Sequence, residues 1–151
     1  MINISVKRDE IKKSIVEIVK NIKEPLYRGL GEIAEKDYLK RGKLILYEGN
    51  MSVGRGVFFS NDIGYALKFA KNYLLITSRE IIDPENKVID TRIKGYDEKI
   101  REKLGEISGW GLWQEIQKYD TITVESNSGY VYTCRDEMDS DKLIYEIKLN
   151  N

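Results

Sequence analysis

The sequence contains no histidine. A Ser-His-Asp triad, a Cys-His dyad and any histidine-based metal site are therefore excluded within this chain. A zinc site would need carboxylates and a single thiol, which is an unfavourable donor set, so we expect no metal. If the protein is an enzyme, its proton transfers must use carboxylates, lysine, tyrosine or bound water.

Cysteine is almost as scarce. Cys134 is the one cysteine, so an internal disulfide is impossible, and this usage is typical of a reducing compartment. The first residues contain neither the apolar segment nor the small-residue cleavage site of a secretory signal peptide. We therefore expect a cytoplasmic location, where the sequon Asn50-Met51-Ser52 would not be glycosylated.

Net charge and long hydrophobic runs are also missing. Lys plus Arg and Asp plus Glu each total 25, so the overall charge favours neither nucleic acid nor an anionic membrane. No apolar run approaches the roughly 18 residues of a membrane span. The 151 residues are 41% hydrophobic and 33% charged, which suits one globular domain with a core. We expect a single domain over residues 1–151, with an N-terminal helix within residues 1–23 packed on it.

The spacing of apolar residues predicts the elements. Residues 8–22 place their apolar side chains on one helical face, residues 26–30 form a short strand, and residues 31–42 form a second helix that ends at Gly42. Further strands are expected at 44–47, 57–60, 74–77, 87–90, 121–125, 130–134 and 143–149, with short helices within 92–110 and near 113–117. Because the final strands lack crossover helices, we expect an α+β domain with a largely antiparallel sheet.

The stretch from Gly54 to Ala70 organises the rest of the chain. A glycine-flanked turn leads into an apolar, β-favouring run at residues 57–59, and Asn61 or Asp62 can cap the helix that follows. One stripe of this helix faces the core and comprises Ile63, Ala66, Leu67 and Ala70. A second stripe, rotated away from the first, comprises Tyr65, Phe69 and Tyr73. This second stripe indicates either a helix buried on two sides or an aromatic wall for a planar ligand.

Several of these segments together resemble the ADP-ribosyltransferase superfamily. They are Pro25-Leu26-Tyr27-Arg28-Gly29, then Gly54-Arg55-Gly56-Val57-Phe58-Phe59-Ser60, then Tyr65-Ala66-Leu67-Lys68-Phe69-Ala70. The chain is most similar to the poly(ADP-ribose) polymerase and diphtheria toxin branch, in which a strand ends in aromatic-His-Gly and a Gly-Lys-Gly-Ile-Tyr-Phe strand runs into a helix bearing a tyrosine. The strands at 129–132 and 143–147 are similar to the last two strands of that family. The resemblance implies a mixed, split β-sheet with flanking helices.

The sequence departs from the family pattern at several positions. Arg28 replaces the histidine of the first strand, as in the arginine-using branch, and Ser60 alone remains of that branch's Ser-Thr-Ser strand. Phe69 stands where the helix carries a tyrosine. The catalytic glutamate of the polymerase branch would fall near Gly129, so the nearest substitute is Glu125, with Asp136 and Glu137 as alternatives.

The resemblance implies that NAD is the substrate and that nicotinamide leaves its ribose through an oxocarbenium-like state. In this chain Phe69, with Tyr65 or Tyr73, would stack on nicotinamide, and Arg28 would pair with ribose or phosphate oxygens. Gly29 would let its backbone approach the carboxamide, and Ser60 would also contact NAD. Glu125 would steady the developing cation without any metal.

The functional expectation is an NAD-dependent ADP-ribosyltransferase, a toxin or effector that acts on an unidentified macromolecule, with a protein favoured as acceptor. Hydrolysis of NAD, in which water is the acceptor, is an alternative enzymatic reaction. The alternative to an enzyme is a catalytically inactive member of the same fold that binds a nucleotide or a protein. A small α+β interaction protein outside this family is a lesser possibility.

Overall fold

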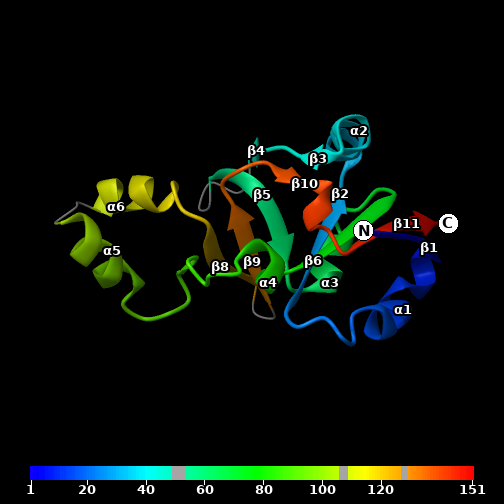
Figure 1. Ribbon diagram of the computed structural model, residues 1–151, viewed down its shortest axis with the longest axis horizontal. Coiled ribbons are helices and arrows are strands. Elements are labelled where there is room, and N and C mark those ends of the chain that lie inside the picture. The colour runs from blue at the N-terminus through cyan, green and yellow to red at the C-terminus, as the bar shows by residue number, and fades with distance from the viewer. Residues whose placement is uncertain (49–53, 106–108, 127–128) are drawn as a thin grey trace.

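The computed structural model describes residues 1–48, 54–105, 109–126 and 129–151. Within these residues the main feature is a nine-stranded sheet in the order β1-β11-β6-β2-β5-β9-β8-β7, with β4 paired to β5 off this path (Figure 1). Its strands are β1 Ile2–Lys7, β2 Pro25–Leu30, β4 Tyr47–Glu48, β5 Arg55–Ser60, β6 Tyr73–Ser78, β7 Ile89–Asp90, β8 Thr121–Ser126, β9 Gly129–Cys134 and β11 Tyr145–Asn150. A second, two-stranded sheet pairs β3 Lys43–Leu44 with β10 Met138–Asp139.

Helices flank this sheet. They are α1 Ile11–Ile18, α2 Glu32–Arg41, α3 Ile63–Leu67, α4 Arg79–Ile82, α5 Tyr96–Leu104 and α6 Gly109–Ile116, with 3-10 turns η1 Arg8–Glu10 and η2 Ser140–Lys142. The outer pairs β1–β11 and β7–β8 are parallel, whereas the pairs between them are antiparallel. The expected α+β class, with a mixed and largely antiparallel sheet and flanking helices, is confirmed.

The N-terminal segment differs from the expectation. Residues 1–23 contain a helix, α1, but the chain begins with the strand β1, which runs parallel to β11 at the edge of the sheet. The alternation of Ile2, Ile4 and Val6 with polar residues is the sequence signal for this strand. Its partner lies at the far end of the chain, so the pairing depends on the tertiary structure.

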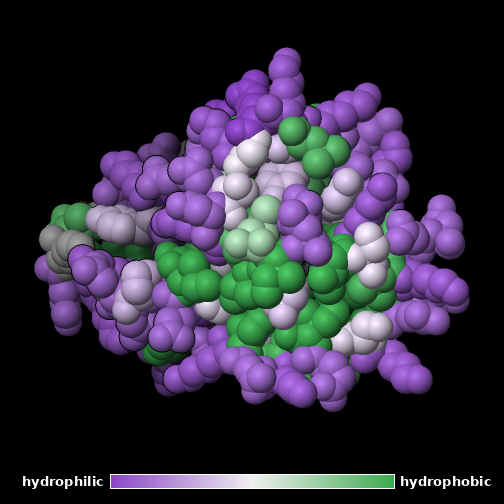
Figure 2. All heavy atoms as spheres, turned by 45° about the vertical axis from the view of Figure 1, so that its right-hand side comes forward, coloured by the Kyte–Doolittle hydropathy of each residue, from purple (hydrophilic) through white to green (hydrophobic). Residues whose placement is uncertain are grey.

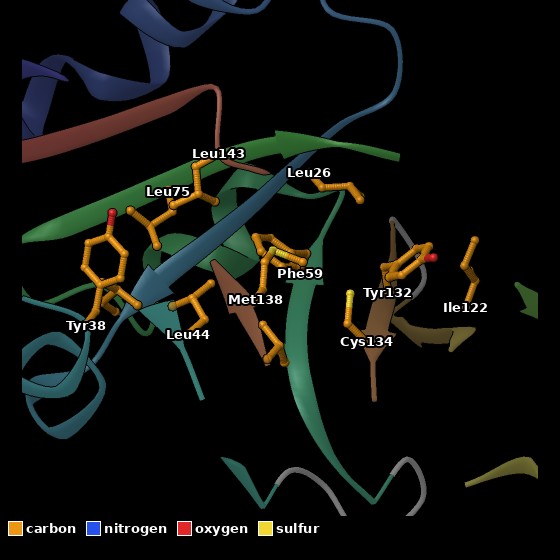
Figure 3. Close-up of a cluster of buried hydrophobic side chains, with 12 residues drawn as sticks. Leu26, Tyr38, Leu44, Phe59, Leu75, Ile122, Tyr132, Cys134, Met138 and Leu143 are labelled. Atoms are coloured by element: carbon orange, nitrogen blue, oxygen red, sulfur yellow. The ribbon is translucent and has the colours of Figure 1, made fainter. Parts of the chain in front are cut away.

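Two hydrophobic clusters cover opposite faces of the sheet, because successive side chains of a strand point to opposite sides. In β2, Leu26 and Leu30 belong to the first cluster and Tyr27 to the second. The first cluster also contains Tyr38 of α2, Leu44 of β3 and Met138 of β10 (Figure 3). The second cluster contains buried residues of α1 and α3, namely Ile11, Ile15 and Ala66.

The helix after β5 is shorter than the sequence pattern suggested. The helix α3 ends at Leu67, and Tyr73 lies in β6 rather than on the helix, so the expected three-residue aromatic stripe is wrong. The apolar stripe is present, since Ala66 and Ala70 are buried and Ile63 and Leu67 pack against the same cluster.

The surface carries exposed hydrophobic side chains beside its many charges. Figure 2 shows hydrophobic residues gathered in the middle of one face, with hydrophilic residues around them. At the opposite end of the molecule from β1, α5 and α6 lie beyond β8 (Figure 1). There the Trp110 and Trp113 rings stack with centroids 5.2 Å apart, and Trp110 is exposed. No helix in the described part of the chain is long and apolar enough to cross a membrane.

Candidate functional site

The strands that carry the family-like motifs, β2 and β5, are neighbours but share only one register pair in the described residues, Tyr27 with Ser60. Beyond that pair the two strands splay apart (Figure 3). A continued antiparallel ladder would place Gly29 opposite Phe58, but that pairing is not formed. The ladder between β2 and β5 is therefore interrupted from Gly29 onward, and we call the place where the two strands diverge the β2–β5 junction.

The backbone of Gly29 points into this junction. In a strand, the N–H and C=O groups of successive residues point alternately to its two edges. The carbonyls of Glu24 and Leu30 accept hydrogen bonds from Arg79 and Lys71 on the β6 side, so the backbone groups of Gly29 face β5. Gly29 is also partly exposed between the buried Arg28 and Leu30. One donor and one acceptor are thus presented side by side at an accessible position.

The facing edge of β5 is satisfied by three different groups. Ser60 pairs with β2, Gly56 pairs with Tyr47 of β4, and the carbonyl of Phe58 between them accepts a 3.1 Å hydrogen bond from Arg28 Nη1. The Arg28 side chain thus takes the place of the ladder bond that Gly29 does not make. This substitution keeps the Phe58 carbonyl bonded while the strands stay apart.

Arg28 is a buried cation with few partners. The residue is 9% exposed, and its Nε has no hydrogen-bond partner in the described part of the chain. Burial lowers the pKa of Arg28 to about 10, against smaller opposing effects of Tyr47 and Cys134, so the guanidinium remains charged at neutral pH. The Arg28 Cζ lies over the Tyr47 ring, 5.2 Å from its centroid. A buried guanidinium with unused N–H donors suits an anionic or carbonyl-bearing ligand.

Gly29 is also required by packing. A Cβ at this position would collide with Ala66 O and would lie 2.7 Å from Ala70 N and 2.9 Å from Ala70 Cβ. The chain around α3 therefore crosses β2 directly over Gly29.

Asp62, one of the two expected caps, stabilises the turn between β5 and α3. Its Oδ1 accepts hydrogen bonds from the N–H groups of Gly64 and Tyr65 at the start of α3.

The expected aromatic residues lie on the α3 side of the junction. Tyr65 and Phe69 contact each other edge to face, with centroids 5.2 Å apart, and Phe69 is 56% exposed. Phe69 is therefore not a core residue. Arg28 leaves β2 on the opposite face of the sheet, together with Leu26 and Leu30. The aromatic pair and the guanidinium therefore lie on opposite faces of the sheet, so the structure does not bring them together on one face as the resemblance implied.

Ser60 lies at the point where the two strands meet. It is buried, is paired with Tyr27 and Val131, and its Oγ accepts a hydrogen bond from the backbone N–H of Asp62. Its hydroxyl therefore supports the turn into α3 directly. A contact of Ser60 with NAD stays a prediction.

The candidate carboxylates lie at the two ends of β9. The backbone of Glu125 belongs to β8 at an irregularity beside the β8–β9 hairpin, and its side chain lies outside the described part of the structure. Asp136 and Glu137 follow the other end of β9; Asp136 is exposed, and Glu137 forms a 2.9 Å ion pair with Lys43. Glu137 is therefore engaged in attaching β10 to β3, and Asp136 is the less constrained of these two.

Sequence reasoning missed Tyr47 and the carbonyl of Phe58 as parts of this site. Tyr47 was expected only as the end of a short strand. The available signal was the strand's position just before the glycine-bearing segment, but the contact of the Tyr47 ring with Arg28 joins residues that are distant in the sequence.

Comparison with known proteins identifies no family for this chain: no family model, no curated protein and no solved structure matches it.

Proposed function

We propose that this chain is an NAD-dependent ADP-ribosyltransferase that binds NAD at the β2–β5 junction. The observation that supports this proposal is the divergence of the two motif strands beyond the Tyr27–Ser60 pair. Among the described residues, it leaves the β5-facing backbone groups of Gly29 without a ladder partner, beside the guanidinium of Arg28, whose Nε has no hydrogen-bond partner there. The polar parts of NAD include an amide group and a diphosphate, and these two protein groups are complementary to them.

Each group has a chemical role in the proposal. The N–H of Gly29 donates to the carboxamide oxygen of nicotinamide and its C=O accepts from the carboxamide NH₂, while Arg28 donates to phosphate or ribose oxygens. Phe69 and Tyr65 supply an aromatic surface for the ring on the α3 face, so in this proposal NAD extends between the diverging strands to reach Arg28 on the other face. Binding two ends of one ligand at fixed positions orients the bond that is to break.

The proposed reaction transfers ADP-ribose. The bond between the ribose C1′ and the nicotinamide nitrogen breaks, and the electron pair leaves with nicotinamide. The carboxylate of Glu125 stabilises the oxocarbenium-like cation and takes the proton of the acceptor as the acceptor bonds to C1′. In our proposal the acceptor is a protein side chain, and water in its place would give hydrolysis of NAD.

A second candidate function is that of a catalytically inactive nucleotide-binding module. It is favoured by the position of Gly129, whose added Cβ would lie 2.7 Å from Asn61 Oδ1. The position where the resemblance implies a catalytic glutamate is therefore closely packed by the turn before α3. In this candidate the junction binds NAD or another nucleotide without cleaving it.

Release of nicotinamide tests the two candidates. We expect the wild-type chain to release nicotinamide from NAD in the presence of cell lysate, and Glu125→Gln to lower kcat by about 10²–10³ with NAD binding little changed. The comparison variant is Asp136→Asn/Glu137→Gln, which should retain activity. Loss of activity only in this double variant would assign the catalytic role to Asp136 or Glu137, at the other end of β9. NAD binding without any release of nicotinamide would favour the inactive module.

A further inference from the structure

Among the described residues, the Arg28 cation faces an aromatic ring and forms no ion pair with a carboxylate. Of these residues, Tyr47 and Cys134 are the charged or polar groups that affect its pKa, and the one hydrogen bond of its guanidinium goes to a backbone carbonyl. The Tyr47 ring faces Arg28 Cζ at 5.2 Å. A cation over a ring face is stabilised by the ring quadrupole, and this contact is stronger where water is excluded.

The Tyr47 ring is itself held in place at both ends. Its backbone pairs with Gly56 of β5, and its hydroxyl donates a 3.4 Å hydrogen bond to Asp37 Oδ2 on α2. Burial, with a further contribution from the Asp37 charge, raises the pKa of Tyr47, so the hydroxyl remains a donor. The ring is thus fixed between β5 and α2, at the end of the junction opposite the Tyr27–Ser60 pair.

The type of partner decides what Arg28 can still bind. A carboxylate would occupy the guanidinium N–H donors in their plane and cancel the charge that attracts an anion. A ring face contacts the guanidinium without accepting those in-plane hydrogen bonds. The ring therefore orders the side chain and leaves its remaining donors for a ligand.

From this arrangement we propose that Tyr47 is a positioning residue that holds Arg28 in the β2–β5 junction for the diphosphate part of NAD. This inference rests on the proposed function and adds a specificity role to it. Tyr47 acts through Arg28, so it affects ligands that carry phosphate. It has no effect on nicotinamide alone, which would bind at Gly29.

The test measures dissociation constants for NAD and for free nicotinamide with wild type, Tyr47→Leu and Tyr47→Phe. We expect Tyr47→Leu to weaken NAD binding about 5–30-fold, the effect of a desolvated cation–π contact, and to leave nicotinamide binding unchanged. Tyr47→Phe keeps the ring and should bind NAD nearly as well as wild type. Tyr145→Leu, which removes a partly buried tyrosine from β11 elsewhere in the sheet, is the matched control.

The outcomes separate this inference from the function on which it rests. If wild type binds NAD and Tyr47→Leu binds it equally well, the positioning role is wrong and the proposed function stands. Equal losses for NAD and nicotinamide in Tyr47→Leu, or a similar NAD loss in Tyr145→Leu, would show a general structural defect and would also overturn it. If wild type binds no NAD, the proposed function and this inference fall together.

Discussion

Replacement of Gly29 by alanine tests the close packing of the chain around α3 against β2. The added Cβ would meet Ala66 O and two atoms of Ala70, at 2.7 Å and 2.9 Å. Two of these three atoms belong to the backbone, so no side-chain rotation relieves the contact, and the segment must move as a whole. Such overpacking typically costs about 1–3 kcal/mol, occasionally more.

The net effect includes one opposing contribution. Alanine restricts the unfolded chain more than glycine does, which favours the folded state by about 0.5–1 kcal/mol. Because the backbone contacts cannot be relieved by rotation, the cost lies at the upper end of the overpacking range, about 3 kcal/mol, and we expect a net loss of about 2 kcal/mol or more for Gly29→Ala. For a domain of this size, 1 kcal/mol corresponds to a change in Tm of about 2–4 °C, so Tm should fall by about 4–8 °C or more.

Gly31→Ala is the matched control, two residues further along. Its added Cβ would have only an ordinary contact, 3.7 Å from Phe69 O, and its φ of −73° suits any residue. Because Gly31 is the N-cap of α2, alanine costs at most about 1 kcal/mol there. Thermal unfolding followed by circular dichroism gives both values. Equal Tm values for the two variants would refute the packing argument at Gly29.

Three further changes test the turn, an ion pair and the junction. Asp62→Ala removes the cap of α3 and should cost about 1 kcal/mol in chemical unfolding, whereas Asp62→Asn keeps the acceptor; equal stabilities would contradict the capping role. The hydrogen bond from Arg92 lowers the pKa of Asp90, so the charged carboxylate stabilises the fold above its unfolded-state pKa, and this contribution is lost as pH falls through the folded-state pKa. Asp90→Asn should therefore destabilise the protein at about pH 7, and this effect should shrink progressively as pH falls below 3.8, the ordinary pKa of the carboxyl; an effect independent of pH would contradict this. Arg28→Met removes a buried charge and also the hydrogen bond to the Phe58 carbonyl, so the loss of thermal stability should not exceed about 1–3 kcal/mol, while calorimetry should show NAD binding weakened about tenfold or more; unchanged NAD affinity would exclude Arg28 from the site.

The local elements followed from the sequence because their causes are local. Apolar residues at helical spacing predicted α1, and Gly42 ends α2 with a φ of 69°, a left-handed conformation that glycine adopts without strain. The run at 57–59 and the cap at Asp62 predicted β5 and the start of α3. Short-range sterics and hydrogen bonds decide these features, so residue type and spacing contain the information.

Only the tertiary structure decided how these elements meet. The pairing of β1 with β11 joins the two ends of the chain, and Tyr73 became part of β6 because strand pairing there outweighed the helical spacing. The interrupted ladder beside Gly29, the bond from Arg28 to the carbonyl of Phe58, and the Tyr47 ring over the guanidinium likewise depend on strands that diverge. Such contacts join residues distant in the sequence, whose approach depends on the packing of the whole sheet, so no local pattern encodes them.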